Sequence, residues 1–229
     1  MRKIFIVTEG GSEIGFGHVT RCLSLYQAFE AKGITPKFIV NGDKVIEDIL
    51  RGRDAEIFDW LRDKDRLFGM ILGADIAVVD SYLADLPVYK RVAECSKVAA
   101  FIDDNKRLDY PSGVVVNGTL YAEELFLKKR EDVRCLLGTD YLPLRKDFWR
   151  VPKKTVRRTP KSILITFGGH DSRNLTPKIL DALASAYTGM IKNVFVGEYF
   201  LRSLNETSIF NMALCLKYCF EKKCKYGSF

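Results

Sequence analysis

The fold is decided by residues 3–33, which read KIFIVTEGGSEIGFGHVTRCLSLYQAFEAKG. Their apolar start, residues 3–7, predicts a buried strand, and the loop that follows it to residue 17 is rich in glycine. Beyond the loop, apolar side chains recur every three or four residues, which is the spacing of an amphipathic helix, and Gly33 is a typical helix terminator. The stretch therefore predicts a strand, a glycine loop and a helix.

Strand and helix patterns continue to alternate over the first part of the chain. Further strands are predicted at 37–40, 76–79, 98–102, 114–116 and 133–137, and further helices at 44–50 and 87–95. Alternation of this kind predicts an α/β fold with a mostly parallel sheet and helices on both of its faces.

The alternation is interrupted at residues 151–161, where prolines and basic residues predict a linker. A new strand at 162–167, a glycine loop and a helix from about residue 174 to 187 repeat the opening theme, and a strand at 193–196 follows. We therefore expect a first domain over 1–150 and a partial second domain with an atypical tail over 162–229.

Composition narrows the class of protein. The 229 residues are 47% hydrophobic and 28% charged, as in folded globular proteins. Neither a membrane-spanning run nor a signal peptide is recognisable, so we expect a cytoplasmic protein without a membrane partner. The net charge of +7 favours anionic partners. Nucleic acid is disfavoured because the basic linker lacks interleaved aromatic residues.

The most informative motif is Gly15-Phe16-Gly17-His18, at the point where the first strand hands over to its helix. Ligands of open α/β sheets bind at such strand ends, and glycines allow close approach of the backbone. The helix dipole favours a neutral imidazole, so His18 is a candidate general base for activating water. A tight turn with a merely structural histidine is the alternative that spacing leaves open.

Two cofactor classes are poorly supported by this loop. From Gly15 the sequence reads G-x-G-x-x-T, with Thr20 where a dinucleotide fingerprint has its third glycine, and P-loop spacing is absent as well. We therefore expect neither a nicotinamide cofactor nor ATP hydrolysis.

Other polar groups follow later strands. Asp80-Ser81-Tyr82 is expected at the same sheet edge as His18, where it orients substrate or water or forms only a solvated turn. Asp103 and Asp104 carry the same ambiguity. A metal site is not expected, because these carboxylates lack a third ligand and the cysteines near the C-terminus lack zinc spacing.

The second glycine loop, Gly168-Gly169-His170-Asp171, follows the strand predicted at 162–167. This loop could face the first one across a cleft, with His170 on a phosphate. The structural alternative is a helix start capped by Asp171, Ser172 or Asn174.

An ordered series of motifs resembles a known family, the UDP-sugar hydrolases of pseudaminic acid biosynthesis, together with related proteins named for spore-coat polysaccharide synthesis. The matching segments span roughly residues 1–183 and are IGFGHVTRCL (14–23), VDSY (79–82), FIDD (101–104), VN (116–117), LGTDY (137–141), LR (144–145) and ITFGGHDSRNLT (165–176).

The resemblance implies a glycosyltransferase-B-like architecture of two Rossmann-like domains, with the sugar bound mainly by the first and UDP by the second. It implies a metal-independent hydrolase, without a cofactor, that releases UDP from a UDP-linked 2,4-diacetamido-2,4,6-trideoxy sugar. His18 matches the base, and Asp80 and Tyr82 match a motif near the reaction. The substrate-binding residues implied are Gly15, Gly17, Arg21, Asn117, Gly168, Gly169 and Asn174.

The chain departs from the family pattern in two places. Ser81 stands where the family often has histidine, and the glycine-rich loop and glutamate that help to bind UDP are not found after Gly197. The second domain is therefore predicted to be incomplete. A glycosyltransferase of the same fold and a noncatalytic sugar-nucleotide-binding remnant remain the alternatives to the hydrolase.

Overall fold

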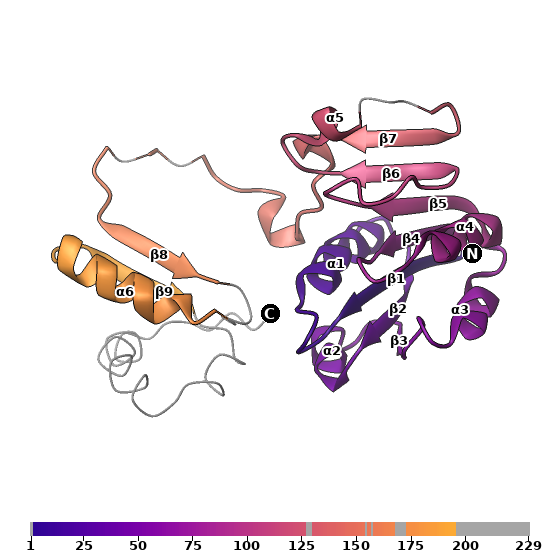
Figure 1. Ribbon diagram of the computed structural model, residues 1–229, viewed down its shortest axis with the longest axis horizontal. Coiled ribbons are helices and arrows are strands. Elements are labelled where there is room, and N and C mark those ends of the chain that lie inside the picture. The colour runs from indigo at the N-terminus through magenta and orange to yellow at the C-terminus, as the bar shows by residue number, and fades with distance from the viewer. Residues whose placement is uncertain (1, 127–129, 154, 157, 168–172, 196–229) are drawn as a thin grey trace. The chain divides into compact units, whose positions relative to one another are not determined.

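The computed structural model describes residues 2–126, 130–153, 155–156, 158–167 and 173–195. Contacts divide the chain into two compact units, residues 1–151 and residues 152–229 (Figure 1). Within the described residues, no helix combines the length and the apolar composition needed to cross a bilayer.

The first unit is built on one sheet of seven strands in the order β3-β2-β1-β4-β5-β6-β7, and every neighbouring pair is parallel. The predicted α/β class is therefore confirmed. The strands are β1 (Ile4–Gly10), β2 (Lys37–Gly42), β3 (Ala55–Ile57), β4 (Ala74–Asp80), β5 (Ser96–Ile102), β6 (Gly113–Asn117) and β7 (Val133–Leu137).

Helices connect most successive strands, although the described residues between β5 and β6 form none, and three of the helices lie where the apolar spacing predicts. They are α1 (Gly17–Glu30), α2 (Lys44–Ile49), α3 (Lys64–Ile71), α4 (Leu86–Cys95) and the short α5 (Ala122–Leu125), followed by the 3-10 turns η1 (Thr139–Tyr141) and η2 (Lys146–Phe148). The elements β3, α3 and α5 are not predicted from the sequence. Each is short, and α3 contains Gly69, which weakens the helical pattern.

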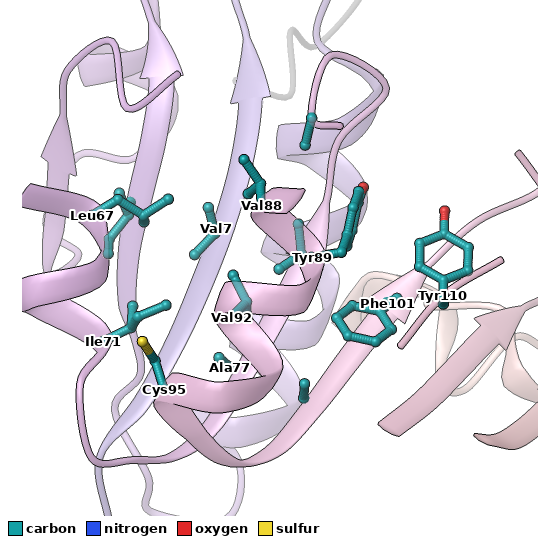
Figure 2. Packing of buried hydrophobic residues seen from close by; sticks show 14 of the residues in the cluster. Val7, Leu67, Ile71, Ala77, Val88, Tyr89, Val92, Cys95, Phe101 and Tyr110 are labelled. Atoms are coloured by element: carbon teal, nitrogen blue, oxygen red, sulfur yellow. The ribbon is translucent and has the colours of Figure 1, made fainter. Parts of the chain in front are cut away.

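The strands bury both faces of the sheet, because successive side chains point to opposite sides. Ile6 packs with α1 and α2, whereas its neighbour Val7 packs with α3 and α4. Figure 2 shows the second of these cores, in which Val88 and Val92 of α4 lie against the sheet. Such two-sided burial fixes the strand register, since a shift of one residue would exchange the two faces.

An aromatic group closes this second core at one side. The rings of Tyr89 and Phe101 meet edge to face at 5.3 Å, and Tyr110 lies 5.0 Å from Tyr89 and 5.2 Å from Phe101 (Figure 2). The hydroxyl of Tyr110 donates to Asp103 Oδ2 at 2.9 Å. The core therefore connects directly to the polar residues at the carboxyl end of β5.

The second unit contains the parallel pair β8 (Ser162–Thr166) and β9 (Ile191–Phe195), joined by α6 (Leu175–Ala186). These elements lie close to the predicted strand, helix and strand. The described residues of 151–161 belong to no helix or strand, as a linker requires. The sugar-binding and nucleotide-binding roles of the two domains remain predictions.

Two glycines at the ends of β1 and β2 allow these strands to pack closely beside the loop that carries the first motif. A Cβ on Gly42 would lie 2.5 Å from the carbonyl oxygen of Gly10 and 2.8 Å from Ile46 Cγ1. We expect Gly42→Ala to lower the free energy of unfolding by about 1–3 kcal/mol, the usual cost of overpacking. Urea denaturation followed by circular dichroism measures this loss.

Gly69→Ala is the matched control. A Cβ on Gly69 meets nothing within 4 Å, and the residue lies inside α3. Alanine there is expected to raise stability by up to about 1 kcal/mol through its better helix propensity. Equal losses in both variants would contradict the close approach at Gly42.

Candidate active site

The loop between β1 and α1 has a fixed shape. Gly11 and Gly15 form a small antiparallel bridge, with N–H to O distances of 3.1 Å and 2.7 Å, and both residues have positive φ. Asp43 Oδ2 accepts hydrogen bonds from the N–H and the hydroxyl of Ser12 at 2.8 Å and 2.7 Å. The backbone hydrogen bond from Ser12 is the main reason why the pKa of Asp43 is lowered. The loop thus leads directly into α1, which begins at Gly17.

His18 lies in the first turn of α1 with its Nδ1 only 2.7 Å from Asp80 Oδ1. Because a carboxylate only accepts hydrogen bonds, this contact assigns the proton of the neutral imidazole to Nδ1 and leaves a lone pair on Nε2. Nε2 has no hydrogen-bond partner among the described residues, although the side chain is only 13% exposed. A base oriented by a carboxylate is the arrangement that general-base catalysis uses.

Asp80 ends β4, directly beside β1, with Thr8 and Asp80 paired in the register. Its side chain is fully buried, and Arg21 donates to both of its oxygens, from Nε at 2.8 Å and from Nη2 at 2.7 Å. Burial alone would raise the pKa of this carboxyl, but the hydrogen bonds from His18 and Arg21 outweigh it and hold the pKa below its usual value. The carboxylate is therefore charged near neutral pH.

Arg21 joins two carboxylates at the edge of the sheet. It lies one helical turn after His18. In addition to its hydrogen bonds to Asp80, it donates from Nη1 to the carboxylate of Asp104. Burial by itself lowers the pKa of this guanidinium. The hydrogen bonds and charges of Asp80 and Asp104 raise it by a larger amount, so the pKa lies above its usual value. The predicted substrate contact of Arg21 remains a proposal, since in the structure its donors meet protein carboxylates.

Tyr82 covers His18 from the loop after β4. The two rings meet edge to face with centroids 4.6 Å apart. The Tyr82 hydroxyl accepts a hydrogen bond from Asn105 Nδ2 at 3.1 Å, and 41% of the residue is exposed. Partial burial, with the charge of Asp104 second, raises the pKa of this phenol. The segment Asp80-Ser81-Tyr82 therefore lies at the same sheet edge as His18, as the sequence predicts, and the catalytic roles of these residues remain predictions.

Ser81 itself points away from that surface. Its side chain is buried and donates to the carboxylate of Glu9, the residue before the end of β1. Glu9 also accepts from the N–H groups of Tyr82 at 2.7 Å and Leu83 at 3.2 Å. Sequence analysis misses Glu9, because the only available signal is an acidic residue at a strand end, and its partners lie far along the chain.

The remaining predicted residues are not gathered at His18 by any contact between described residues. Asn117 is buried at the end of β6, where its Oδ1 accepts from the N–H and hydroxyl of Thr119 at 2.9 Å and 2.7 Å. Asn174 precedes α6 in the second unit with a left-handed φ of 49°, and its side chain does not cap the helix. Gly168 and Gly169 lie outside the described residues.

Asp103 and Asp104 do not act as one pair. Asp103 accepts from Asn105 N–H at 2.9 Å, from Arg107 N–H at 2.6 Å and from Tyr110, which shapes the loop after β5. Asp104 turns instead to Arg21. In the part of the chain that the structure describes, no three His, Cys, Asp or Glu side chains are grouped as metal ligands.

No family model matches the chain. The chain is 30% identical over 210 residues to the uncharacterized protein MJ1062 of Methanocaldococcus jannaschii. That match covers 86% of this chain and 43% of the relative, so the chain spans less than half of the relative's length. Among solved structures, it is similar to MurG of Acinetobacter baumannii with a TM-score of 0.49 and 12% identity, over 85% of this chain and 67% of that one.

The charge cluster predicts a pH-dependent stability. In Asp80→Asn, Arg21 keeps Asp104 as a charged partner. We therefore expect the free energy of unfolding to fall by about 1–3 kcal/mol near pH 7, less than the usual cost of leaving a buried charge unpaired. The folded pKa of Asp80 lies below its unfolded value of about 3.9, so its contribution is present above that pH and is lost as the pH falls through the folded pKa.

Urea denaturation of both proteins over about pH 3 to 7 checks this prediction. The difference between wild type and Asp80→Asn is expected to be largest near neutral pH and to shrink in acid. A constant difference across the range would show that Asp80 does not carry the charge assigned to it.

Proposed function

We propose that this chain is a UDP-sugar hydrolase that cleaves a UDP-linked 2,4-diacetamido-2,4,6-trideoxy sugar into the free sugar and UDP. The observation that carries this proposal is the pair formed by His18 and Asp80, which combines an oriented imidazole with an Nε2 that has no hydrogen-bond partner among the described residues. The resemblance to the hydrolases of pseudaminic acid biosynthesis supplies the substrate, and a glycosyltransferase-B-like arrangement of two domains is part of the same proposal.

In the proposed reaction, His18 Nε2 accepts a proton from a water molecule. The water oxygen forms a bond to the anomeric carbon, while the bond from that carbon to the β-phosphate oxygen breaks and its electron pair leaves with UDP. Asp80 holds the imidazole in the required tautomer and stabilises the imidazolium that forms, as carboxylates do in related dyads. The proton on His18 then passes to solvent, so that the site returns to its starting state.

Arg21 and Tyr82 are proposed to shape the site around this base. Arg21 fixes Asp80 through two hydrogen bonds, which prevents the carboxylate from turning away from His18. The exposed part of Tyr82 offers an aromatic surface and a hydroxyl beside the base, which suits a sugar with acetamido groups. Gly15 and Gly17 allow the substrate to approach the backbone closely.

The binding of UDP is assigned by resemblance to the second unit. Gly168, Gly169 and Asn174 are the proposed contacts, and Asn117 is a proposed contact from the first unit. Asn117 has one feature in favour of such a role, because its buried Nδ2 has no hydrogen-bond partner among the described residues.

The proposal is tested by time-resolved NMR of the purified protein with the UDP-linked diacetamido-trideoxy sugar and no added metal. Free sugar and UDP are expected to appear together. His18→Ala is expected to abolish turnover, and Asp80→Asn to lower it by about 100- to 10,000-fold, since the imidazole then loses its orientation and its negative partner.

Lys97→Met is the control variant. Lys97 pairs with Asp75 near the amino ends of the strands, at the opposite edge of the sheet from His18, so turnover should not change. Unchanged turnover in folded His18→Ala would refute the assigned base. Turnover that requires an added acceptor would indicate a glycosyltransferase, and binding without turnover a noncatalytic sugar-nucleotide-binding protein.

A further inference from the structure

Glu9 carries a carboxylate that the proposed reaction does not use. The residue is fully buried at the end of β1, and removing a charge from water is costly unless hydrogen bonds compensate for it. Among the described residues, its hydrogen-bond donors all belong to one loop and are the Ser81 hydroxyl and the N–H groups of Tyr82 and Leu83. The hydrogen bonds that offset the burial of this carboxylate are therefore donated by the loop that carries Tyr82.

The hydrogen bonds have a fixed direction. Each partner donates to Glu9, and the Ser81 oxygen in turn accepts from the N–H groups of Leu83 at 3.1 Å and Ala84 at 3.0 Å. The single N–H of Leu83 is shared between Ser81 and Glu9, and the proton of the Ser81 hydroxyl is donated to Glu9. An amide in place of the carboxylate would keep one acceptor oxygen, but its NH2 group would replace the other oxygen and could not accept the Ser81 proton.

A second anchor holds the same loop from the side of β5. Arg107 Nη2 donates to the carbonyl oxygens of Ser81 and Ala84, both at 3.0 Å, and lies 3.2 Å from the Tyr89 hydroxyl. The loop is therefore held through its N–H groups by Glu9 and through its carbonyl groups by Arg107. Between these anchors, the Tyr82 ring projects onto the imidazole of His18.

We propose that Glu9 is a positioning residue for the base, which acts through Tyr82. Its carboxylate fixes the backbone of Tyr82, so that the tyrosine ring packs against His18 and confines the imidazole to the orientation in which Nδ1 meets Asp80. The catalytic consequence rests on the proposed hydrolase function. The geometric claim concerns only Glu9, Tyr82 and His18 and has its own readout.

That readout is the NMR signal of the His18 ring protons. The chain has 2 histidines, so His18→Ala identifies the signal, and Tyr82→Leu gives its position without the neighbouring ring current. In Glu9→Gln we expect the His18 signal to move from the wild-type position toward the Tyr82→Leu position. Glu47→Gln, which removes an exposed carboxylate from α2, should leave it unchanged.

Ser81→Ala keeps the buried carboxylate but removes one of its donors, and it is expected to shift the His18 signal in the same direction by a smaller amount. This second variant decides the question if Glu9→Gln fails to fold. Wild-type His18 signals in folded Glu9→Gln, or in Ser81→Ala alone if the first variant is unfolded, would overturn the proposal.

Turnover of the same variants tests the catalytic part. We expect kcat of Glu9→Gln to fall by about 10- to 100-fold with KM changed much less, because a displaced base affects the reacting geometry more than substrate binding. Glu9→Asp, which keeps the acceptor but shortens the reach, should recover part of kcat. A shifted His18 signal with unchanged kcat would refute the catalytic role, whereas an inactive wild type would refute the hydrolase and leave the NMR test of Glu9 standing.

Discussion

The buried carboxylate of Asp80 is the charge around which the site is organised. It lies at the end of a central strand with no exposed surface, and such a charge is stable only when opposite charges and hydrogen bonds surround it. His18 and Arg21, one turn apart on α1, supply these partners. The same contacts that stabilise the carboxylate therefore fix the first turns of α1 against β4 and set the tautomer of the imidazole.

The sheet order explains why these groups meet. The connection from β1 leads through α1 to β2 on one side, whereas β4 lies on the other side of β1. In open parallel sheets, ligands bind outside the carboxyl ends of the strands at such a change of direction. Glu9, one residue before the end of β1, and Asp80, the last residue of β4, lie at that point. Asp80 contacts the imidazole, whereas Glu9 holds the loop beside it.

Much of the fold follows from the sequence, because its signals are local. The strand, glycine loop and helix of residues 3–33 appear as β1 and α1, and Asp80 lies at the same sheet edge as His18, as expected. The sequence does not predict their direct contact at 2.7 Å. The short elements β3 and α3 escape prediction, since a few residues carry too little periodicity to be recognised. Their formation depends on packing against neighbouring strands and helices.

The finer parts of the site could not be predicted from local patterns. Ser81 occupies a position at which the resembled family often has histidine, and the structure shows it turned toward Glu9. That pairing joins residues 72 positions apart, so neither residue alone indicates it. The division of Asp103 and Asp104 between Tyr110 and Arg21 has the same cause. The tertiary structure determines which polar side chains meet, whereas strands and helices leave a pattern within a few neighbouring residues of the sequence.

The proposed attack of water on the anomeric carbon is tested most directly by tracing the oxygen atom of water into the products. The protein is allowed to hydrolyse the UDP-linked diacetamido-trideoxy sugar in ¹⁸O-labelled water, and mass spectrometry locates the label at early times, before the anomeric hydroxyl exchanges with solvent. Water activated by His18 attacks carbon, so the account predicts label in the free sugar and none in UDP, with both products absent for His18→Ala. Label in the β-phosphate of UDP would show attack at phosphorus and contradict the mechanism.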